Sequence, residues 1–306
     1  MPPQSSISVV VIVRNMKKTI RRTLYSVLNA QPDEIIVVDG QSTDGTSKII
    51  DEFPVVHVYD SGKGPAVARN IGLKLSRGEY VAMVDGDEYV PHNFIQIIRE
   101  NISKHGYFDL LIGEHKFIIQ GFWGRCLTVE RKHVMPFILA SLARISSLVR
   151  RASFYKEGLS FYEMDPRVFR KAVIKEIGGY NENLSTFEHP YDIYWRMLEK
   201  FGNDLLIIKD NRLQIYGDET DVSPLNEFKR GVFYGRGLAP FFRVHRLRAL
   251  LQIMSLPPFE FIYLPIILIS SIIISRSFKI ALGIIALRLA RSIGYLHGLI
   301  KKSCEH

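Results

Sequence analysis

Cysteine is scarce in this chain of 306 residues, which contains only two. Cys126 and Cys304 lie far apart and lack the spacing of metal ligands, so the sequence offers no cysteine-based metal site. We expect both to be free thiols in a reducing compartment. The N-terminus also lacks the basic segment of a secretory signal peptide, and we expect the main domain to stay in the cytosol.

Net charge is absent from most of the chain. The formal net charge is +9, and residues 226–306 account for all of it with twelve Lys and Arg against three Asp and Glu. A neutral main domain argues against a nucleic-acid partner, whereas a basic tail favours an anionic surface, most simply a membrane leaflet with anionic lipids. The length suits one domain with an appendage. We therefore expect a main domain over residues 1–225 and a membrane-associated helical region over 226–306.

Short apolar, β-branched runs alternate with helical patterns in the first 105 residues. This alternation predicts an α/β fold with a mostly parallel sheet and helices on both faces. The sequence predicts strands at 7–13, 34–38, 55–59, 81–84, 109–113, 116–119 and 205–208. It predicts helices at 20–28, from about 43, at 64–76, from 91, and at 133–151, 168–178 and 191–201.

The tail contains two apolar segments. Residues 259–275 are about the minimum length to cross a bilayer, but prolines at 257, 258 and 265 would kink the segment. Residues 278–300 contain Arg288 and Arg291, and a charge at the bilayer centre costs about 2.5–3.5 kcal/mol. We expect an in-plane or shallow helix with its basic face at the headgroups, in a re-entrant hairpin that returns to the cytosol. A dimerising or core helical pair is the alternative.

Acidic and basic side chains gather where the predicted strands end. Asp85 and Asp87 follow the fourth strand and Asp39 ends the second, and such strand ends face the ligand crevice of open α/β sheets. Two carboxylates one residue apart can share a hard divalent cation with a substrate's phosphates. Lys63 and Arg69 flank a helix whose N-terminal amides favour anions. The pattern predicts a site for a phosphate-bearing ligand.

Three segments resemble a family 2 glycosyltransferase of the GT-A fold, namely residues 37–46, 64–72 and 84–87. The likeness runs from residue 7 to about 210. The basic segment 228–237 and the apolar tail resemble the membrane-associated, ExoA-like branch that builds exopolysaccharides and lipid-linked glycans. The resemblance implies an inverting, metal-dependent enzyme that moves a sugar from a nucleoside-diphosphate donor to a lipid-linked or glycan hydroxyl at the cytosolic membrane face.

The resemblance also implies roles in nucleotide binding. Asp39 matches the acidic residue that contacts the base or the ribose, although a helix N-cap or turn role is the alternative. Val13 and Asn15 stand where the family lines the base pocket, and Arg14 between them departs from the family's pattern and could face the diphosphate instead.

The same resemblance places the donor's diphosphate near the acidic motif. Asp87 is expected to ligate Mg²⁺ or Mn²⁺ directly, and Asp85 to contact the ribose or to reach the ion through water. Lys63 and Arg69 are expected in the region that closes over the donor, with ordinary surface charge as the alternative. Glu88 is expected to be an exposed acid that leads into a helix.

The catalytic base is placed by likeness to the family's Glu-Asp pair ahead of an Arg. His189-Pro190 stands where that pair belongs, so Glu188 is the first candidate and Asp192 the second, with His189 also possible. First-turn acids that favour a helix dipole are the alternative reading. Asp218 or Glu219 could replace a histidine that ligates the metal in some relatives.

Two rival functions fit the same residues. A polyprenyl-phosphate sugar synthase would use a lipid phosphate as its acceptor and would need no base. The rival from another class is a non-catalytic, membrane-attached nucleotide-binding module, and the complete set of carboxylates at 39, 85 and 87 argues against it. The sequence does not determine the sugar, the nucleotide, the linkage or the oligomeric state.

Overall fold

A computed structural model describes residues 5–118, 121–134, 166–184, 189–218, 222–233, 235 and 257–303. The chain divides into two compact units. Residues 1–117 and 164–218 form the first, here called the sheet unit, and residues 118–163 and 219–306 form the second, here called the helical unit. The composition places a boundary at residue 225, whereas the contacts place it after 218 and add residues 118–163 to the helical unit.

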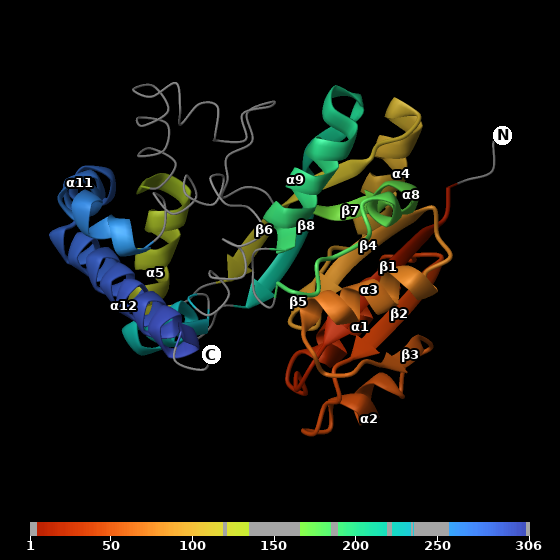
Figure 1. Ribbon diagram of the computed structural model, residues 1–306, viewed down its shortest axis with the longest axis horizontal. Helices are drawn as coiled ribbons and strands as arrows, with labels where there is room; N and C mark the ends of the chain where they lie inside the picture. The colour runs from red at the N-terminus through yellow and green to blue at the C-terminus, as the bar shows by residue number, and fades with distance from the viewer. Residues whose placement is uncertain are drawn as a thin grey trace. The chain divides into compact units, whose positions relative to one another are not determined.

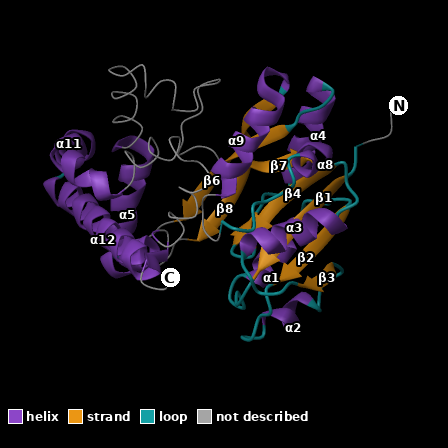
Figure 2. Ribbon diagram, in the orientation of Figure 1, coloured by secondary structure: helices purple, strands orange, loops and turns teal. Residues whose placement is uncertain are grey.

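One mixed sheet organises the sheet unit, with the order β3-β2-β1-β4-β7-β6-β8-β5 (Figure 1, Figure 2). The first four strands in this order run parallel, while β4 with β7, β6 with β7 and β5 with β8 pair antiparallel. The α/β fold expected from the sequence is confirmed. The antiparallel pairing of β5, β6, β7 and β8 was not predicted. The strands are β1 (Ile7–Val13), β2 (Glu34–Asp39), β3 (Val56–Tyr59), β4 (Tyr80–Asp85), β5 (Glu88–Tyr89), β6 (Leu110–Ile118), β7 (Pro166–Arg170) and β8 (Ile207–Asp218).

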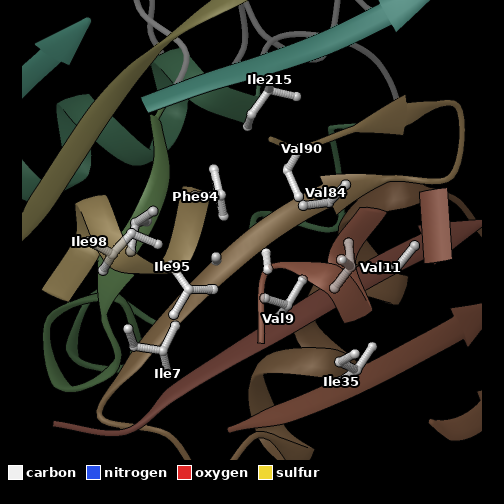
Figure 3. Close-up of a cluster of buried hydrophobic side chains, with 14 of the residues drawn as sticks. Ile7, Val9, Val11, Ile35, Val84, Val90, Phe94, Ile95, Ile98 and Ile215 are labelled. Carbon is white, nitrogen blue, oxygen red and sulfur yellow. The ribbon is translucent and has the colours of Figure 1, made fainter. Parts of the chain in front are cut away.

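Helices pack against both faces of β1, as alternate residues of that strand show. Val9 and Val11 belong to a buried cluster with residues of α1 and α4, such as Leu24 and Phe94. Figure 3 shows Val9, Val11 and Phe94 in this cluster. Val10 points the other way and meets α3. The helices of this unit are α1 (Ile20–Asn29), α2 (Thr46–Ile50), α3 (Pro65–Leu75), α4 (Phe94–His105), α8 (Lys171–Glu176) and α9 (His189–Phe201).

Tertiary pairing moves several predicted boundaries. The helix predicted over 168–178 is wrong at its start, because Val168 and Phe169 pair with β4 as strand residues and the helix begins only at Lys171. The helix expected from about residue 43 begins at Thr46, and the helix expected from 91 begins at Phe94. The helix predicted over 133–151 lies outside the described residues, apart from positions 133–134 at the end of the short π-helix η1 (Glu130–Val134).

The helical unit contains α5 (Gly121–Val129), η1, a helix over residues 224–233, α11 (Pro257–Ser275) and α12 (Phe278–Ser303). Glycines bring α12 against the 224–233 helix. A Cβ on Gly294 would lie 2.1 Å from the Phe228 carbonyl oxygen, and one on Gly231 would lie 2.1 Å from the Arg291 carbonyl oxygen. Such close backbone approach through small residues is typical of helix packing in membranes.

Buried ion pairs correct the expectation of a free basic face on α12. Arg288 is 2% exposed, and its Nε lies 2.8 Å from Glu130 Oε1. The guanidinium of Arg291 pairs with Glu227, whose side chain is also buried. These carboxylates come from two other segments of the same unit, so both arginines are neutralised inside the protein and do not form a face for headgroups. Within the described residues, Phe278–Gly298 is the one helical stretch long and apolar enough to cross a membrane.

Gly72 provides a test of the packing that places α3. We expect Gly72→Ala to destabilise the sheet unit by about 1–3 kcal/mol, because the new Cβ would lie 2.2 Å from Val10 Cγ1 in a filled interior. Thermal unfolding measures the change, and Lys74→Ala on the exposed side of the same helix is the control. Equal melting temperatures for Gly72→Ala and the wild type would contradict this packing.

Candidate active site

The acidic ends of two strands stand side by side at one edge of the sheet. Strand β1 pairs with β2 on one side and with β4 on the other, and its end brings Val13 opposite Asp39 and Ile12 opposite Asp85. Asp87 follows two residues after Asp85. The sheet therefore brings the three predicted carboxylates to the same edge, where open α/β sheets bind their ligands.

Hydrogen bonds from α1 fix the turn that carries Asp85 and Asp87. The hydroxyls of Thr19 and Thr23 donate to the Gly86 carbonyl oxygen at 2.9 and 3.0 Å, and the Gly86 N–H donates to the Ile12 carbonyl. A Cβ on Gly86 would lie 2.8 Å from Val13 Cγ2, so glycine allows the turn to lie against β1. The two threonines were missed by the sequence reading, and their only signal is their i, i+4 spacing on one helix face.

The two carboxylates of the turn differ in their surroundings. Asp85 Oδ1 accepts a hydrogen bond from Arg69 Nη2 at 2.8 Å. Burial alone would lower the pKa of Arg69, but Asp85 raises it and the net shift is upward, so Arg69 stays charged. Asp87 is exposed, yet the surrounding protein reduces the hydration of its carboxylate and Asp85 repels it, and both effects raise the pKa of Asp87.

The donor set suits a cation shared with a ligand. Among the described residues, no group of three or more His, Cys, Asp or Glu side chains could hold a metal ion by itself. Mg²⁺ is commonly bound by one or two carboxylates together with substrate phosphates and waters. Asp85 and Asp87 fit that arrangement, in which the phosphates complete the site.

Glu88 differs from its expectation as an exposed acid. Its side chain is 4% exposed, because Arg167 on β7 forms two hydrogen bonds with its carboxylate. The second oxygen also accepts a hydrogen bond from the Asp85 backbone N–H at 2.8 Å. The sequence reading missed Arg167, for which no local pattern offers a signal.

Asp39 is buried within its own loop. Its Oδ1 accepts hydrogen bonds from the backbone N–H and the hydroxyl of Ser42 at 2.9 and 2.6 Å, and its Oδ2 accepts one from Ser47. The side chain is 0% exposed. These contacts give Asp39 a loop-ordering task, and its contact with a base or ribose stays a prediction.

The loops after β1, β2 and β3 are tied together around Asp39. Asn15 adopts a left-handed backbone with a φ of 54°, and its Oδ1 accepts a hydrogen bond from the Thr43 N–H. Arg14 donates to the Gly62 carbonyl oxygen at 3.0 Å. Val13 is buried at the end of β1, while Lys63 is exposed just before α3. The expected nucleotide-binding positions therefore share one edge of the sheet unit.

The second half of the site rests on α3. Asn70 is hydrogen-bonded to both the N–H and the carbonyl of Tyr180, and the Arg69 guanidinium lies 5.5 Å from the Tyr180 ring centroid. Arg196 of α9 donates to the carbonyls of Ile177 and Gly179 at 2.7 Å each. The glycine turn that precedes the predicted base region is therefore packed beside the donor-side residues of α3.

The two candidate bases stand differently. Asp192 is 0% exposed, and its Oδ2 accepts hydrogen bonds from Arg196 Nε and Nη2 at 2.8 and 2.6 Å. Glu188 lies outside the described residues, as does Glu219. The side chains of His189 and Asp218 are also outside the described part of the structure.

The sheet unit is an α/β domain with acidic residues at its strand ends, which is typical of enzymes that bind phosphate-bearing ligands. Comparison with known families identifies the family. Residues 8–178 match the family described as "Glycosyl transferase family 2". Because this match spans more than half of the chain, the chain belongs to that family, and its sheet unit has the GT-A fold.

Curated relatives share part of the chain. It is 34% identical over 118 residues to "Glycosyltransferase GlyG" of Streptococcus pneumoniae, and the matched region covers 36% of this chain and 38% of that protein. It is 36% identical over 89 residues to "UDP-Glc:alpha-D-GlcNAc-diphosphoundecaprenol beta-1,3-glucosyltransferase WfaP" of Escherichia coli, and the matched region covers 27% of this chain and 36% of that protein. The chain thus spans less than two fifths of the length of either relative.

A solved structure supports the fold alone. The "Crystal Structure of a Mycobacterial Protein" superposes with a TM-score of 0.53 at 18% identity, over 78% of this chain and 74% of that one.

Asp87 offers the direct test of the acidic turn. We expect Asp87→Asn to abolish the rise in melting temperature that Mn²⁺ and a nucleoside diphosphate produce together, because an amide cannot replace an anionic ligand of a hard cation. A thermal-shift screen of UDP, GDP and dTDP with and without Mn²⁺ measures this effect. Glu52→Gln, which neutralises an exposed carboxylate paired with Arg21, is the control. An undiminished Mn²⁺-dependent shift in Asp87→Asn would exclude Asp87 as a ligand.

Proposed function

We propose that this protein is an inverting, metal-dependent glycosyltransferase of the ExoA-like membrane branch. In this proposal it moves a sugar from a nucleoside-diphosphate donor to a lipid-linked or glycan hydroxyl at the cytosolic face of the membrane. The observation that carries the proposal is the convergence of Asp39, Asp85 and Asp87 at one sheet edge in a chain of family 2. The name of WfaP supports a UDP-sugar donor and a diphosphoundecaprenol-linked acceptor.

The residues at the sheet edge divide the work of donor binding. In this proposal Asp87 would ligate Mg²⁺ or Mn²⁺ directly, and Asp85 would contact the ribose or reach the ion through water. The bound ion would supply positive charge that neutralises the departing diphosphate. Arg69 fixes the direction of the Asp85 carboxylate and adds positive charge beside the phosphates. Asp39, with Val13 and Asn15, orients the nucleoside, and Lys63 contributes charge from the loop that leads into α3.

Glu188 is the proposed base, which takes the proton of the acceptor hydroxyl while the diphosphate leaves from the opposite face of the sugar. Asp192 is the second candidate. Its buried ion pair with Arg196 supports a positioning task instead, because that arginine ties α9 to the glycine turn at 177–179. Glu188, which precedes α9 in the sequence, therefore stays the first candidate for the base.

An exposed apolar face in the helical unit supports the proposed membrane attachment. Ile266, Ile269 and Ile273 lie on one face of α11, and they are 49%, 59% and 69% exposed. Water would not favour such a row, whereas acyl chains would cover it. If the acceptor is dissolved in the leaflet, this apolar row would keep the enzyme close to the acceptor.

The base assignment predicts a kinetic effect without loss of fold. We expect Glu188→Gln to lower kcat for transfer to a hydroxyl by about 10²–10⁴-fold at an unchanged melting temperature. Initial rates from UDP-glucose to GlcNAc-diphosphoundecaprenol measure this effect, with undecaprenyl phosphate as the alternative acceptor. Asp192→Asn is the comparison, and we expect it to lower the melting temperature because it leaves Arg196 short of its partner. An unchanged rate for Glu188→Gln, with transfer to the lipid phosphate, would favour the polyprenyl-phosphate synthase.

The exposed face of α11 predicts how the protein holds the membrane. We expect Ile269→Asp together with Ile273→Asp to lower vesicle binding by about 100-fold or more, because each buried charge costs about 2.5–3.5 kcal/mol. Flotation with phosphatidylglycerol-containing vesicles measures the bound fraction. Tyr59→Asp with Leu75→Asp, at exposed apolar positions of the sheet unit, is the matched control. Equal flotation of the two double variants would contradict membrane contact through α11.

A further inference from the structure

A buried ion pair lies directly behind the acidic turn. Glu88 on β5 and Arg167 on β7 are 4% and 7% exposed, and two hydrogen bonds of 2.9 and 2.7 Å join them. His115 on β6 lies beside the pair, with its Nε2 3.3 Å from Glu88 Oε1. Three strands therefore supply this cluster, and neither the family resemblance nor the proposed mechanism gives it a role.

The pair is connected to the turn through one shared oxygen atom. Glu88 Oε2 accepts a hydrogen bond from Arg167 Nη1 at 2.9 Å and another from the Asp85 backbone N–H at 2.8 Å. Arg167 fixes the position of the Glu88 carboxylate with one hydrogen bond to each oxygen. The fixed carboxylate in turn holds the Asp85 backbone N–H in place. Charged, two-point hydrogen bonds have the directional strength that this task needs.

Other contacts hold the neighbouring groups of the turn. The Gly86 carbonyl is already held by Thr19 and Thr23, and the Asp85 carboxylate by Arg69. The Glu88 carboxylate accepts a hydrogen bond from the Asp85 N–H at the start of the turn. Without it, rotation about the Asp85 backbone would redirect both acidic side chains.

We propose that Glu88 and Arg167 are positioning residues that aim the Asp85 and Asp87 carboxylates at the shared cation. The inference rests on the proposed function, because it concerns the same metal-dependent donor site. The pair contributes no net charge, and the hydrogen bond from the Asp85 N–H to Glu88 connects it to the turn. Residues that orient metal ligands from behind typically change metal affinity or activity by 10–100-fold when they are replaced.

Arg170 offers a matched control on the same strand. Arg170 Nη2 donates to Asp109 Oδ1 at 2.6 Å, so it also forms a partly buried arginine pair. It lies opposite Tyr80, at the start of β4, whereas Asp85 ends that strand. Loss of Arg170 should therefore affect stability without reaching the acidic turn.

The test compares UDP binding by the full-length protein in Mn²⁺ and in EDTA, measured by isothermal titration calorimetry. We expect Arg167→Met to weaken Mn²⁺-dependent UDP binding by about 10-fold or more and to leave binding in EDTA unchanged. Arg170→Met should lower the melting temperature and keep the wild-type Mn²⁺ dependence. Arg167→Lys keeps the charge but not the two-point geometry, so it should also weaken Mn²⁺-dependent UDP binding, by less than Arg167→Met does. If Arg167→Met does not fold, Arg167→Lys takes its place in the test.

A double variant separates positioning from stability. Replacing a buried ion pair by apolar side chains of similar size often restores stability, so Glu88→Met with Arg167→Met should recover the melting temperature lost in Arg167→Met. It should not recover Mn²⁺-dependent binding, because the Asp85 N–H still lacks its acceptor. Wild-type Mn²⁺ dependence in Arg167→Lys and in the double variant would overturn the inference. Absence of Mn²⁺-dependent binding of UDP, GDP and dTDP by the wild type would instead overturn the proposed function, and this inference with it.

Discussion

The pairing of β1 with a parallel strand on each side is the constraint on which the site depends. This pairing carries the ends of β2 and β4 to one edge, so Asp39 and Asp85 stand on either side of the end of β1. β1 is buried along its whole length, with Val9 and Val11 in the cluster of α1 and α4 and Val10 against α3, so close packing on both faces holds the strand in place. Hydrophobic packing thus determines where the acidic groups lie.

Around this edge, polar side chains are held by fixed partners rather than by solvent. Asp39 is ordered by Ser42 and Ser47, and Asp85 by Arg69. Asp87 is left exposed beside a like charge, with its pKa raised, which is the state that a divalent cation would relieve. The proposed donor site therefore uses groups that the fold already holds in place before a ligand binds.

In the helical unit, the fold changes the environment of two arginines that the sequence alone suggests are exposed. Arg288 and Arg291 look like a basic face in the sequence, yet Glu130 and Glu227 neutralise them within the protein. What remains exposed on α11 is the apolar row at Ile266, Ile269 and Ile273. The basic residues and the exposed apolar row of the tail are thus separate features, and the proposed membrane contact rests on the apolar row.

Periodicity and turn chemistry predicted the parallel strands and their acidic ends, because these features depend on neighbours in sequence. The resemblance of three motifs to known proteins predicted the family. Only the tertiary structure decided the rest. Residues 168–169 became a strand because β4 offered them hydrogen bonds, and Glu88 became buried because Arg167, 79 residues away, supplied its counter-charge. A charged side chain's burial depends on a partner that the fold brings to it, and no local pattern contains that partner.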